Sequence, residues 1–483
     1  MAHDLLIIGG GINGCAIARE AALNGLSVLL VEKDDLAAHT SSASTKLIHG
    51  GLRYLETYEF RLVREALHER ERLLAAAPHL IHPLRFVLPH AHALRPWWMV
   101  RAGLLLYDLL AGRSSLPRSR GLGRGDAGLT ASLAHPHGGF VYWDAAVDDS
   151  RLTIANAQDA ALHGAEIATR TELLSARRAD GLWHAELSDG RSVQARMVVN
   201  AAGPWVAALF GRLGTGARSA VRLVKGSHIV VPRLFEGDQA YILQQPDRRI
   251  VFAIPYGDHT EVGTTDVPVE RPEDAQCSDD EATYLCEAVN RYFRHQVTPA
   301  DIAWRWSGVR PLHDDGTSAA QSVTRDYLLE IDSEGPPLLS VFGGKITTAR
   351  ALAEDAMARI APLLGTEVSA TSRGRVFPGG AIPEFDRYLE QVRARWPFLG
   401  AARSLRMARA YGSMLGTMLE HVDAEVDMGS DAGAGLTAIE IAWMRDREWA
   451  RTAEDVLWRR SKLGLAGVPG MAERVTAALA RSG

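Results

Sequence analysis

Cysteine is scarce in this sequence: the 483 residues include three, Cys15, Cys277 and Cys286. They form no CxxC pair and no cluster with metal-ligand spacing, so we expect neither a disulfide framework nor a bound metal. A reduced, cytosolic setting fits them best. The net charge of −5 is small for this length and gives no argument for a nucleic-acid partner, so none is expected.

Long apolar runs are also missing. The most apolar stretch, "PWWMVRAGLLLYDLLAG", is interrupted by Arg101 and Asp108, and its uncharged runs fall below the ~20 residues needed to span a bilayer. The first apolar run, Leu5–Ile8, starts almost at once and ends in glycines, unlike a signal peptide. We therefore expect no membrane span and no secretory leader. The length allows two or more domains.

The first 33 residues read as strand, glycine turn, helix and strand. Leu5–Ile8 and Leu26–Val31 are the apolar runs expected of buried parallel strands, and Gly25 ends the helix between them. Three glycines follow the first strand at GxGxxG spacing: Gly9, Gly11 and Gly14. Glu32 closes the second strand, where a carboxylate can accept hydrogen bonds from a ribose. This context predicts dinucleotide binding and disfavours a 2′-phosphate, which leaves NAD and FAD open.

Two later segments look like returns of the chain to this nucleotide-binding unit. They are "ARMVVNAAGPWV" (195–206) and "PLLSVFGGKITTARALAEDAMARI" (337–360). Between them, "VRLVKGSHIVVP", "RIVFAIPYG" and "TEVGTTD" predict an antiparallel sheet. A Gly/Ser/Pro-rich stretch then leads into helical periodicity, in which Thr452 and Asp455 have capping-box spacing. We predict an α/β fold with a Rossmann-type domain, an inserted antiparallel β domain and a C-terminal α-helical domain.

A stretch rich in hydroxyl groups, "TSSASTKLIHGGLRYLETYEF" (40–60), follows the second strand. Taken alone, it fits a solvated turn ahead of a helix that starts near Glu59. Read with its neighbours, it resembles the FAD-dependent glycerol-3-phosphate dehydrogenases, a family within the glycine-oxidase-like flavoenzyme class. The segments that carry this resemblance are the first 33 residues, the 40–60 stretch, "VVNAAGPWV", "RLVKGSHIVVP", "VGTTDV", "SGVRPL", "VTRDY", "LLSVFGGKITTAR" and "REWARTAEDVLWRRSKLGL".

The likeness covers nearly the whole chain and is strongest to the bacterial aerobic, quinone-linked branch. The change to helical periodicity predicts a boundary near residue 376. Residues 1–376 are then an FAD-binding domain interleaved with a substrate domain (roughly 75–145 and 220–330), followed by a helical domain at 377–483. The mitochondrial relatives carry calcium-binding helical hands, whose ligand spacing is absent from the acidic stretch "HVDAEVDMGSDAGAG".

The resemblance assigns FAD as the cofactor and implies which residues hold it. The implied cofactor-binding residues are Gly9, Gly11, Gly14, Glu32, Ser41, Ser42, Ser44, His49, Gly50, Ala201, Gly203, Gly343, Gly344, Lys345 and Thr347. Serine hydroxyls suit an enclosed anionic cofactor because they donate hydrogen bonds without adding charge. The helix after Lys345 should place its N-terminus near the flavin and stabilise negative charge there.

The implied substrate is glycerol 3-phosphate, whose phosphate calls for guanidinium groups that bind oxygens bidentately. The substrate-binding candidates are Arg53, Tyr54, Arg310, Arg325 and Lys345. The catalytic candidates are His49, His228, Arg310 and Lys345. Either histidine could accept the hydroxyl proton, and the residues alone leave that choice open.

Three other functions fit parts of the sequence. Glycerol-3-phosphate oxidase chemistry with O2 as the acceptor is compatible with the same motifs. An FAD amine or amino-acid oxidase needs one carboxylate-binding arginine rather than several phosphate ligands. A non-catalytic dinucleotide-binding sensor explains GxGxxG but leaves the HGGLRY and SGVRP motifs without a role.

A basic, aromatic stretch predicts attachment to an anionic phospholipid surface. From Arg85 to Arg124 there are seven arginines and one acid, Asp108. Apolar side chains lie between them: Trp97, Trp98, Met99, Leu104, Leu105, Leu106 and Tyr107. Such mixtures suit the headgroup boundary, and a membrane quinone as electron acceptor favours this location. A buried helix with a basic rim or a dimer contact would also explain it. We expect a cytoplasmic homodimer, peripheral on the inner face of the cell membrane.

Overall fold

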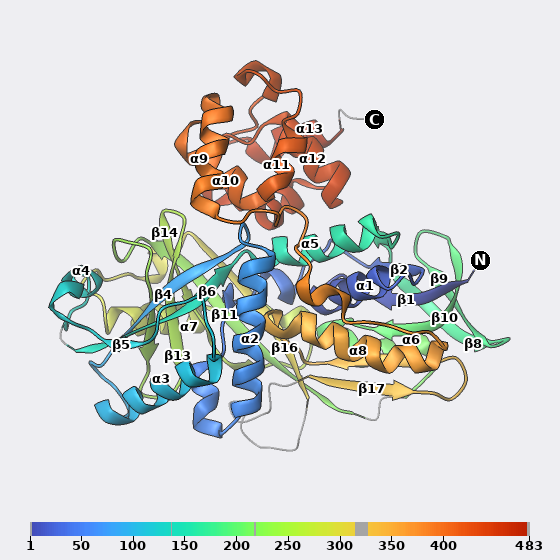
Figure 1. Cartoon of the computed structure of the whole chain (residues 1–483), viewed down its shortest axis with the longest axis horizontal. Coiled ribbons are helices and arrows are strands. Elements are labelled where there is room, and N and C mark those ends of the chain that lie inside the picture. Colours follow the sequence, from blue (N-terminus) through green and yellow to red (C-terminus); the bar gives the residue numbers. More distant parts are fainter. Residues whose placement is uncertain (1, 137, 217–218, 314–326, 481–483) are drawn as a thin grey trace.

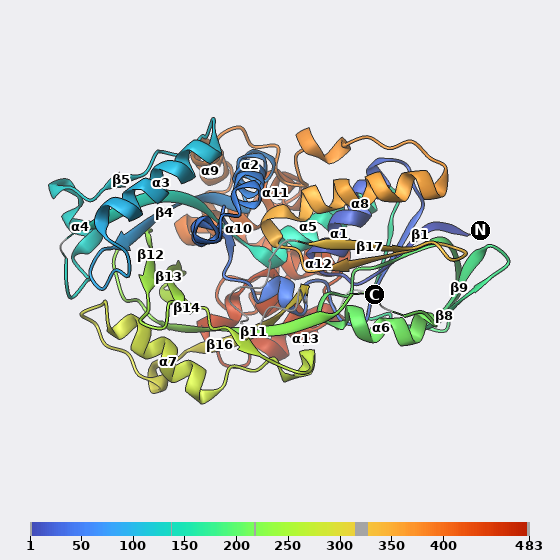
Figure 2. The ribbon, with the colours of Figure 1, turned by 90° about the horizontal axis from the view of Figure 1, so that it is seen from below.

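The computed structural model describes residues 2–136, 138–216, 219–313 and 327–480. Arg325 lies outside these residues. Two sheets form the two ends of the body of the molecule, and a helical lobe projects from one side (Figures 1 and 2). Within the described ranges, no helix has both the length and the apolar character needed to cross a membrane.

The first sheet contains the glycine turn and is largely parallel. Its strand order is β17 (Leu328–Asp332), β18 (Leu338–Phe342), β10 (Ser192–Asn200), β1 (His3–Ile8), β2 (Val28–Glu32) and β7 (Glu166–Thr169). Strand β1 pairs in parallel with both β2 and β10, and β10 pairs in parallel with β18. The two predicted returns of the chain are thereby confirmed. The central parts of β1, β2 and β18 are largely apolar because both faces of the sheet are covered.

Helices pack on both faces of this sheet. One face is covered by α1 (Ile12–Leu23), α5 (Asp149–Leu162) and α8 (Ala349–Leu364), which share one buried apolar cluster with the strands. The other face packs against α6 (Val206–Leu213) and the hairpin of β8 (Leu173–Ala179) and β9 (Leu182–Leu187). The helices cover the faces of the sheet and leave the carboxyl ends of β1 and β2 open toward the second sheet. A nucleotide-binding site is expected at these strand ends in such folds.

The second sheet is mainly antiparallel, as predicted for the insert. Its order is β15 (Val267–Pro268), β11 (Val221–Pro232), β14 (His259–Gly263), β13 (Ile250–Tyr256), β12 (Ala240–Gln244), β4 (Ile81–Pro89), β6 (Gly139–Val147) and β3 (Leu47–Ile48). Strand β16 (Trp304–His313) pairs with β11, and β5 (Arg120–Gly121) pairs with β6. Helix α7 (Asp279–Asn290) packs on one face, whereas α2 (Phe60–Ala76) and α3 (Trp97–Ala111) pack on the other.

The C-terminal lobe is a bundle of short helices with its own apolar core. Its α-helices are α9 (Phe385–Arg395), α10 (Gly400–Tyr411), α11 (Leu415–Met418), α12 (Ala438–Glu448) and α13 (Met471–Ala480). A π-helical turn, η12 (Asp455–Arg460), follows α12. Its predicted capping box is present: the Asp455 carboxylate accepts from the Thr452 N–H, and the Thr452 hydroxyl accepts from the Asp455 N–H. The fold class predicted from the sequence is confirmed.

Candidate functional site

The glycine turn between β1 and α1 brings backbone atoms too close for side chains. Gly9 has a φ of +115°, and a Cβ there would lie 2.5 Å from the Ala201 oxygen. A Cβ on Gly14 would lie 2.0 Å from the Gly9 oxygen. Gly11 is less confined, since its nearest neighbour would be the Ser41 hydroxyl at 3.1 Å. The turn thus leaves the N-terminus of α1 accessible to an anion such as a pyrophosphate.

Glu32 holds this turn from the end of β2. Its Oε2 accepts a hydrogen bond from the Gly10 N–H at 2.6 Å, and its Oε1 accepts one from the Asp34 N–H at 2.9 Å. Burial raises the pKa of the Glu32 carboxyl, and these two backbone donors oppose that rise. Ribose binding by Glu32 remains a prediction, but the carboxylate lines the cavity in which a ribose would lie.

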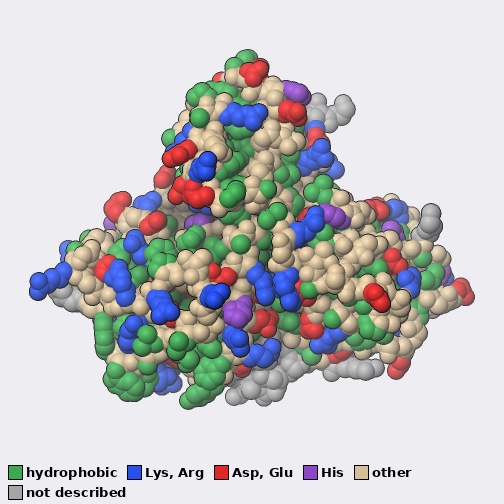
Figure 3. All heavy atoms as spheres, in the orientation of Figure 1, with side chains coloured by type: hydrophobic (Ala, Val, Ile, Leu, Met, Phe, Trp, Pro, Cys, Tyr) green, Lys and Arg blue, Asp and Glu red, His purple; other side chains and the backbone are tan. Residues whose placement is uncertain are grey.

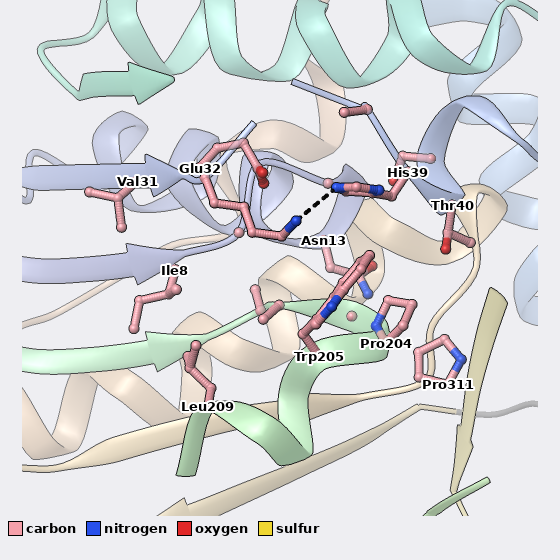
Figure 4. Close-up of a pocket in the computed structure, with 18 of the residues that line it drawn as sticks. Ile8, Asn13, Val31, Glu32, His39, Thr40, Pro204, Trp205, Leu209 and Pro311 are labelled. Carbon is pink, nitrogen blue, oxygen red and sulfur yellow. Dashed lines mark hydrogen bonds between the residues drawn. The ribbon is translucent and has the colours of Figure 1, made fainter. Parts of the chain in front are cut away.

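A cavity opens at the carboxyl ends of β1 and β2 (Figure 4). Ile8, Val31 and Glu32 line one side, and Trp205 and Leu209 line the other. Further predicted cofactor residues border the same cavity: Gly9, Gly11, Ser41, Ala201, Gly203, Gly343 and Gly344. They come from four separate stretches of the chain, so the structure brings together what the sequence keeps up to about 330 residues apart.

The serine-rich loop contributes to the site in three different ways. The Ser41 hydroxyl accepts from the Ile12 N–H at 2.9 Å and so caps α1. The Ser42 hydroxyl donates to the His39 carbonyl at 3.2 Å. The Ser44 hydroxyl donates to the buried Asp149 carboxylate at 2.8 Å. Direct contact of Ser42 and Ser44 with the cofactor stays a prediction, because both hydroxyls already hold the loop in shape.

The HGG segment is supported by residues that the sequence did not single out as site residues. The Gly50 N–H donates to the Tyr107 hydroxyl at 2.8 Å, and that hydroxyl donates to Asp144. Arg70 also binds Asp144, at 2.7 Å. Burial raises the pKa of Asp144, and Arg70 works against this rise. A side chain at position 50 would press on this group, because a Cβ would lie 2.7 Å from the Tyr107 oxygen.

Residues 49–54 lie against the segment that begins α8. The His49 N–H donates to the Thr347 hydroxyl at 3.4 Å. The Lys345 ammonium lies over the Tyr54 ring, 4.0 Å from its centroid. The His49 ring makes an edge contact with Phe252 of the second sheet. The HGG and FGGK motifs, almost 300 residues apart in the sequence, therefore lie side by side. Arg53 lies in the same partly buried turn as Tyr54.

Arg310 extends along the second sheet above a glycine. Its Nη2 donates to the Thr265 carbonyl at 3.0 Å and pairs with Asp266 at 3.0 Å. A Cβ on Gly226 would lie 2.2 Å from this Nη2, so the glycine provides the space the guanidinium occupies. The next residue in the chain, Pro311, lines the cavity that Gly343 also borders. The SGVRP and FGGK motifs therefore meet at one cavity.

His228 is buried on the same face of this sheet. Its Nε2 lies 3.0 Å from the Thr45 hydroxyl, and its ring stacks on Trp306 with centroids 5.3 Å apart. Burial lowers the pKa of His228 well below its usual range, and the positive charges of Lys46 and Arg310 lower it further. The imidazole is thus neutral near pH 7, and its surroundings disfavour the protonated form. The choice between His228 and His49 as base remains open.

Glu261 is a buried acid for which the sequence held no signal. Its Oε1 lies 3.9 Å from the His228 Nε2, and its side chain is 1% exposed. Burial raises the pKa of Glu261 to about 8, with Asp149 raising it further and Lys46 opposing. A lone glutamate in the alternating pattern of a strand is expected to face solvent, and only the tertiary packing around the second sheet buries it.

The free energy of unfolding of a Glu261→Gln variant should increase relative to that of the wild type as the pH rises from about 5 to 8. In that range the folded wild type retains a proton that the unfolded chain has lost, so its stability falls by up to about 1.4 kcal/mol per pH unit. Glutamine cannot ionise and removes this loss. Thermal midpoints of both proteins across this range measure the effect. A constant difference between the two midpoints would show that Glu261 ionises normally.

The fold and the site define a dinucleotide-binding protein, with its cavity between a parallel and an antiparallel sheet. Residues 4–350 match the model of the FAD dependent oxidoreductase family. The chain is 52% identical to glycerol-3-phosphate dehydrogenase of Pseudomonas aeruginosa, covering 96% of this chain and 92% of the relative. It is 49% identical to the aerobic glycerol-3-phosphate dehydrogenase of Escherichia coli (96% and 94%). D-erythritol 1-phosphate dehydrogenase of Brucella abortus is 46% identical (95% and 94%).

Among solved structures, glycerol-3-phosphate dehydrogenase from Bacillus halodurans complexed with FAD matches with a TM-score of 0.75 at 26% identity. The match covers 99% of this chain and 90% of that one. The chain belongs to the glycerol-3-phosphate dehydrogenase family of FAD-dependent oxidoreductases. FAD is its cofactor, and the glycine turn, the accessible N-terminus of α1 and buried Glu32 fit its diphosphate and ribose.

Proposed function

We propose that this enzyme oxidises sn-glycerol 3-phosphate to dihydroxyacetone phosphate and passes the electrons to a membrane quinone. The main support is that Pro311, next to Arg310, and Gly343 and Gly344, next to Lys345, border one cavity. Arg310 and Lys345 are thus chain neighbours of residues that border the cavity, which supports assigning their cations to an anionic substrate beside FAD. A phosphate dianion is the anionic group for which such cations are suited.

Within this proposal, FAD would supply the hydride acceptor for oxidation at C2 of the substrate. Arg310, Arg53 and Lys345 bind the phosphate and orient C2, and such positioning supplies a large part of a rate advantage. His49 and His228 are the candidates to accept the proton of the C2 hydroxyl, and the burial that lowers the pKa of His228 makes it a weaker base than a free imidazole. The N-terminus of α8 stabilises negative charge at the cofactor.

D-Erythritol 1-phosphate is a second candidate substrate, favoured by the relative of 46% identity. Both compounds are phosphorylated polyols and would use the same cations. Anaerobic bleaching of the flavin by each compound, compared with glycerol, sarcosine and proline, tests the substrate class. Fast bleaching by glycerol 3-phosphate supports our assignment. Bleaching only by D-erythritol 1-phosphate would replace the substrate, and bleaching only by an amine would overturn the class.

The electron acceptor needs a separate experiment. Reoxidation of the substrate-reduced enzyme is followed with a short-chain quinone under nitrogen and with air-saturated buffer. Fast reduction of the quinone with little peroxide supports a dehydrogenase. Fast peroxide release under air, with slow quinone reduction, would instead indicate an oxidase.

We also propose that α3 attaches the enzyme to an anionic lipid surface on the inner face of the cell membrane. Its exposed apolar side chains include Trp98 (67%) and Leu109 (74%), and Tyr58 (77%) lies on the neighbouring turn. Figure 3 shows hydrophobic side chains gathered at the lower edge where α3 lies, with Lys and Arg above them. The C-terminal lobe lies on the opposite side of the molecule (Figure 1).

Two features of the predicted surface require correction. Leu104 and Tyr107 are buried (0% and 2% exposed), because they pack against α2 and the second sheet. Three of the seven arginines are also paired with acids: Arg85 with Asp238, Arg95 with Glu56, and Arg120 with Asp126. Three other arginines of this stretch are exposed, and their guanidinium groups therefore have the clearest access to lipid phosphates: Arg113, Arg118 and Arg124.

Replacing Trp97 and Trp98 with serine should weaken binding to anionic liposomes, because the exposed apolar surface of α3 is lost. Neutralising Arg113, Arg118 and Arg124 should weaken it by on the order of 1 kcal/mol each at low salt. Co-sedimentation at low and high salt measures both. Neutralising Arg387 on the C-terminal lobe, which is likewise exposed, is the matched control. Lipid binding that is unchanged in both α3 variants would exclude this surface.

A further inference from the structure

The loop that follows β2 is held from both sides. This cofactor loop (residues 33–46) carries Ser41, which caps α1 at the dinucleotide site. On its inner side, the Ala37 N–H donates to the Gly10 carbonyl at 3.1 Å, and the Asp34 N–H donates to Glu32. Asp35 lies between these two contacts, and its side chain points the other way, into the C-terminal lobe.

Two arginines of the C-terminal lobe bind Asp35. The Arg459 Nε donates to one carboxylate oxygen at 2.7 Å, and the Arg460 Nη2 donates to the other at 2.8 Å. All three side chains are buried: Asp35 is 1%, Arg460 0% and Arg459 7% exposed. A buried carboxylate is stable only when it is paired and hydrogen-bonded, so the loop depends on the lobe at this point.

A second group of contacts holds the far end of the loop. Ser44 and Lys46 bind Asp149, with the Lys46 ammonium 3.0 Å from its carboxylate. The adjacent Asp148 accepts from the ammonium of Lys462, which lies just after η12. Residues 459–462 of the C-terminal lobe therefore contact the loop directly at Asp35 and indirectly at Ser44–Lys46.

We propose that the C-terminal helical domain retains FAD by clamping the cofactor loop, with Asp35, Arg459 and Arg460 as positioning residues. The loop lies between the clamp and the N-terminus of α1. Release of Asp35 would free Ser41 to leave the Ile12 N–H and would loosen Leu36 and Ala37, which pack beside the glycine turn. The clamp has no role in hydride transfer, so it should affect FAD affinity and leave the reduction of bound flavin unchanged.

The test measures FAD affinity of apo-protein by quenching of flavin fluorescence. The variants are Asp35→Asn and Arg459→Gln. The matched control is Glu440→Gln, which removes a buried carboxylate that pairs with Arg406 inside the same lobe. We expect the Kd for FAD to rise at least tenfold in Asp35→Asn and less in Arg459→Gln, since Arg460 still binds Asp35. Glu440→Gln should lower the melting temperature of apo-protein without a comparable change in Kd.

Three results would overturn the proposal. One is an FAD affinity of Asp35→Asn within twofold of the wild type. Another is an equal loss of affinity in Glu440→Gln, which would mean that general destabilisation of the lobe is responsible. The third is an unchanged Kd for FAD in Arg459→Gln, and this variant decides the question if Asp35→Asn does not fold. Measurement of the Kd for FAD needs no substrate, so it tests the clamp even if the proposed substrate is wrong. In addition, the FAD-loaded fraction of each variant should bleach with glycerol 3-phosphate at the wild-type rate.

Discussion

Replacing Gly14 with valine should give protein that is largely colourless. A Cβ at this position would lie 2.0 Å from the Gly9 carbonyl oxygen, and that oxygen belongs to backbone at the start of the glycine turn. The clash can be relieved only by moving α1 away from β1, which displaces the helix N-terminus from the diphosphate. Overpacking of this kind costs about 1–3 kcal/mol or more, so FAD affinity should fall at least about tenfold.

Gly211→Val is the matched control for this experiment. Gly211 also lies within a helix, α6, and nothing lies within 4 Å of a Cβ built there. Its FAD content, read from the flavin absorbance per protein, should match that of the wild type. Gly11→Val should be intermediate, since the nearest atom is a serine hydroxyl at 3.1 Å. Gly14→Val protein that is fully yellow and active would contradict the assignment of the turn to FAD.

Replacing Arg310 with methionine should raise the KM for glycerol 3-phosphate by about tenfold to a hundredfold. Charge-assisted hydrogen bonds contribute about 1.5–3 kcal/mol each, and this guanidinium is one of the cations proposed to hold the phosphate. The flavin spectrum should be unchanged, because Arg310 contacts Thr265 and Asp266 of the second sheet. Any slow oxidation of unphosphorylated glycerol should be unaffected.

Arg305→Met serves as the control, since Arg305 lies on the same strand but pairs with Asp279 at the surface. Its KM should equal that of the wild type. An equal loss of activity on glycerol and glycerol 3-phosphate in Arg310→Met would remove Arg310 from the phosphate site. A similar KM increase in Asp266→Asn would indicate that the ion pair orients Arg310.

Several parts of the fold were predictable because they follow local backbone rules. The glycine spacing of the first turn requires close backbone approach, and the structure has φ of +115° at Gly9 and almost no space at Gly14. Strands buried on both faces appear as continuous apolar runs, which identified β1, β2, β10 and β18. The capping box at Thr452 was readable for the same reason, since its partners are three residues apart.

Lipid attachment through α3 stays a prediction, and the exposure of its individual side chains was not readable from the sequence. The sequence shows tryptophans, leucines and a tyrosine in α3, but the composition does not show which side of the helix faces the protein. The structure exposes Trp98 and Leu109 and buries Leu104 and Tyr107. The tyrosine thereby becomes part of the HGG support instead of the surface.

By itself, the sequence determined the parallel unit, the dinucleotide site and the segments that return to it, because each depends on patterns within a few residues. The tertiary structure alone decided which distant polar groups share a buried environment. Asp144 meets Arg70 and Tyr107, Glu261 lies beside His228, and Asp35 is bound by arginines more than 400 residues away. A buried charge requires a partner wherever the chain path brings one, and no local pattern encodes that path.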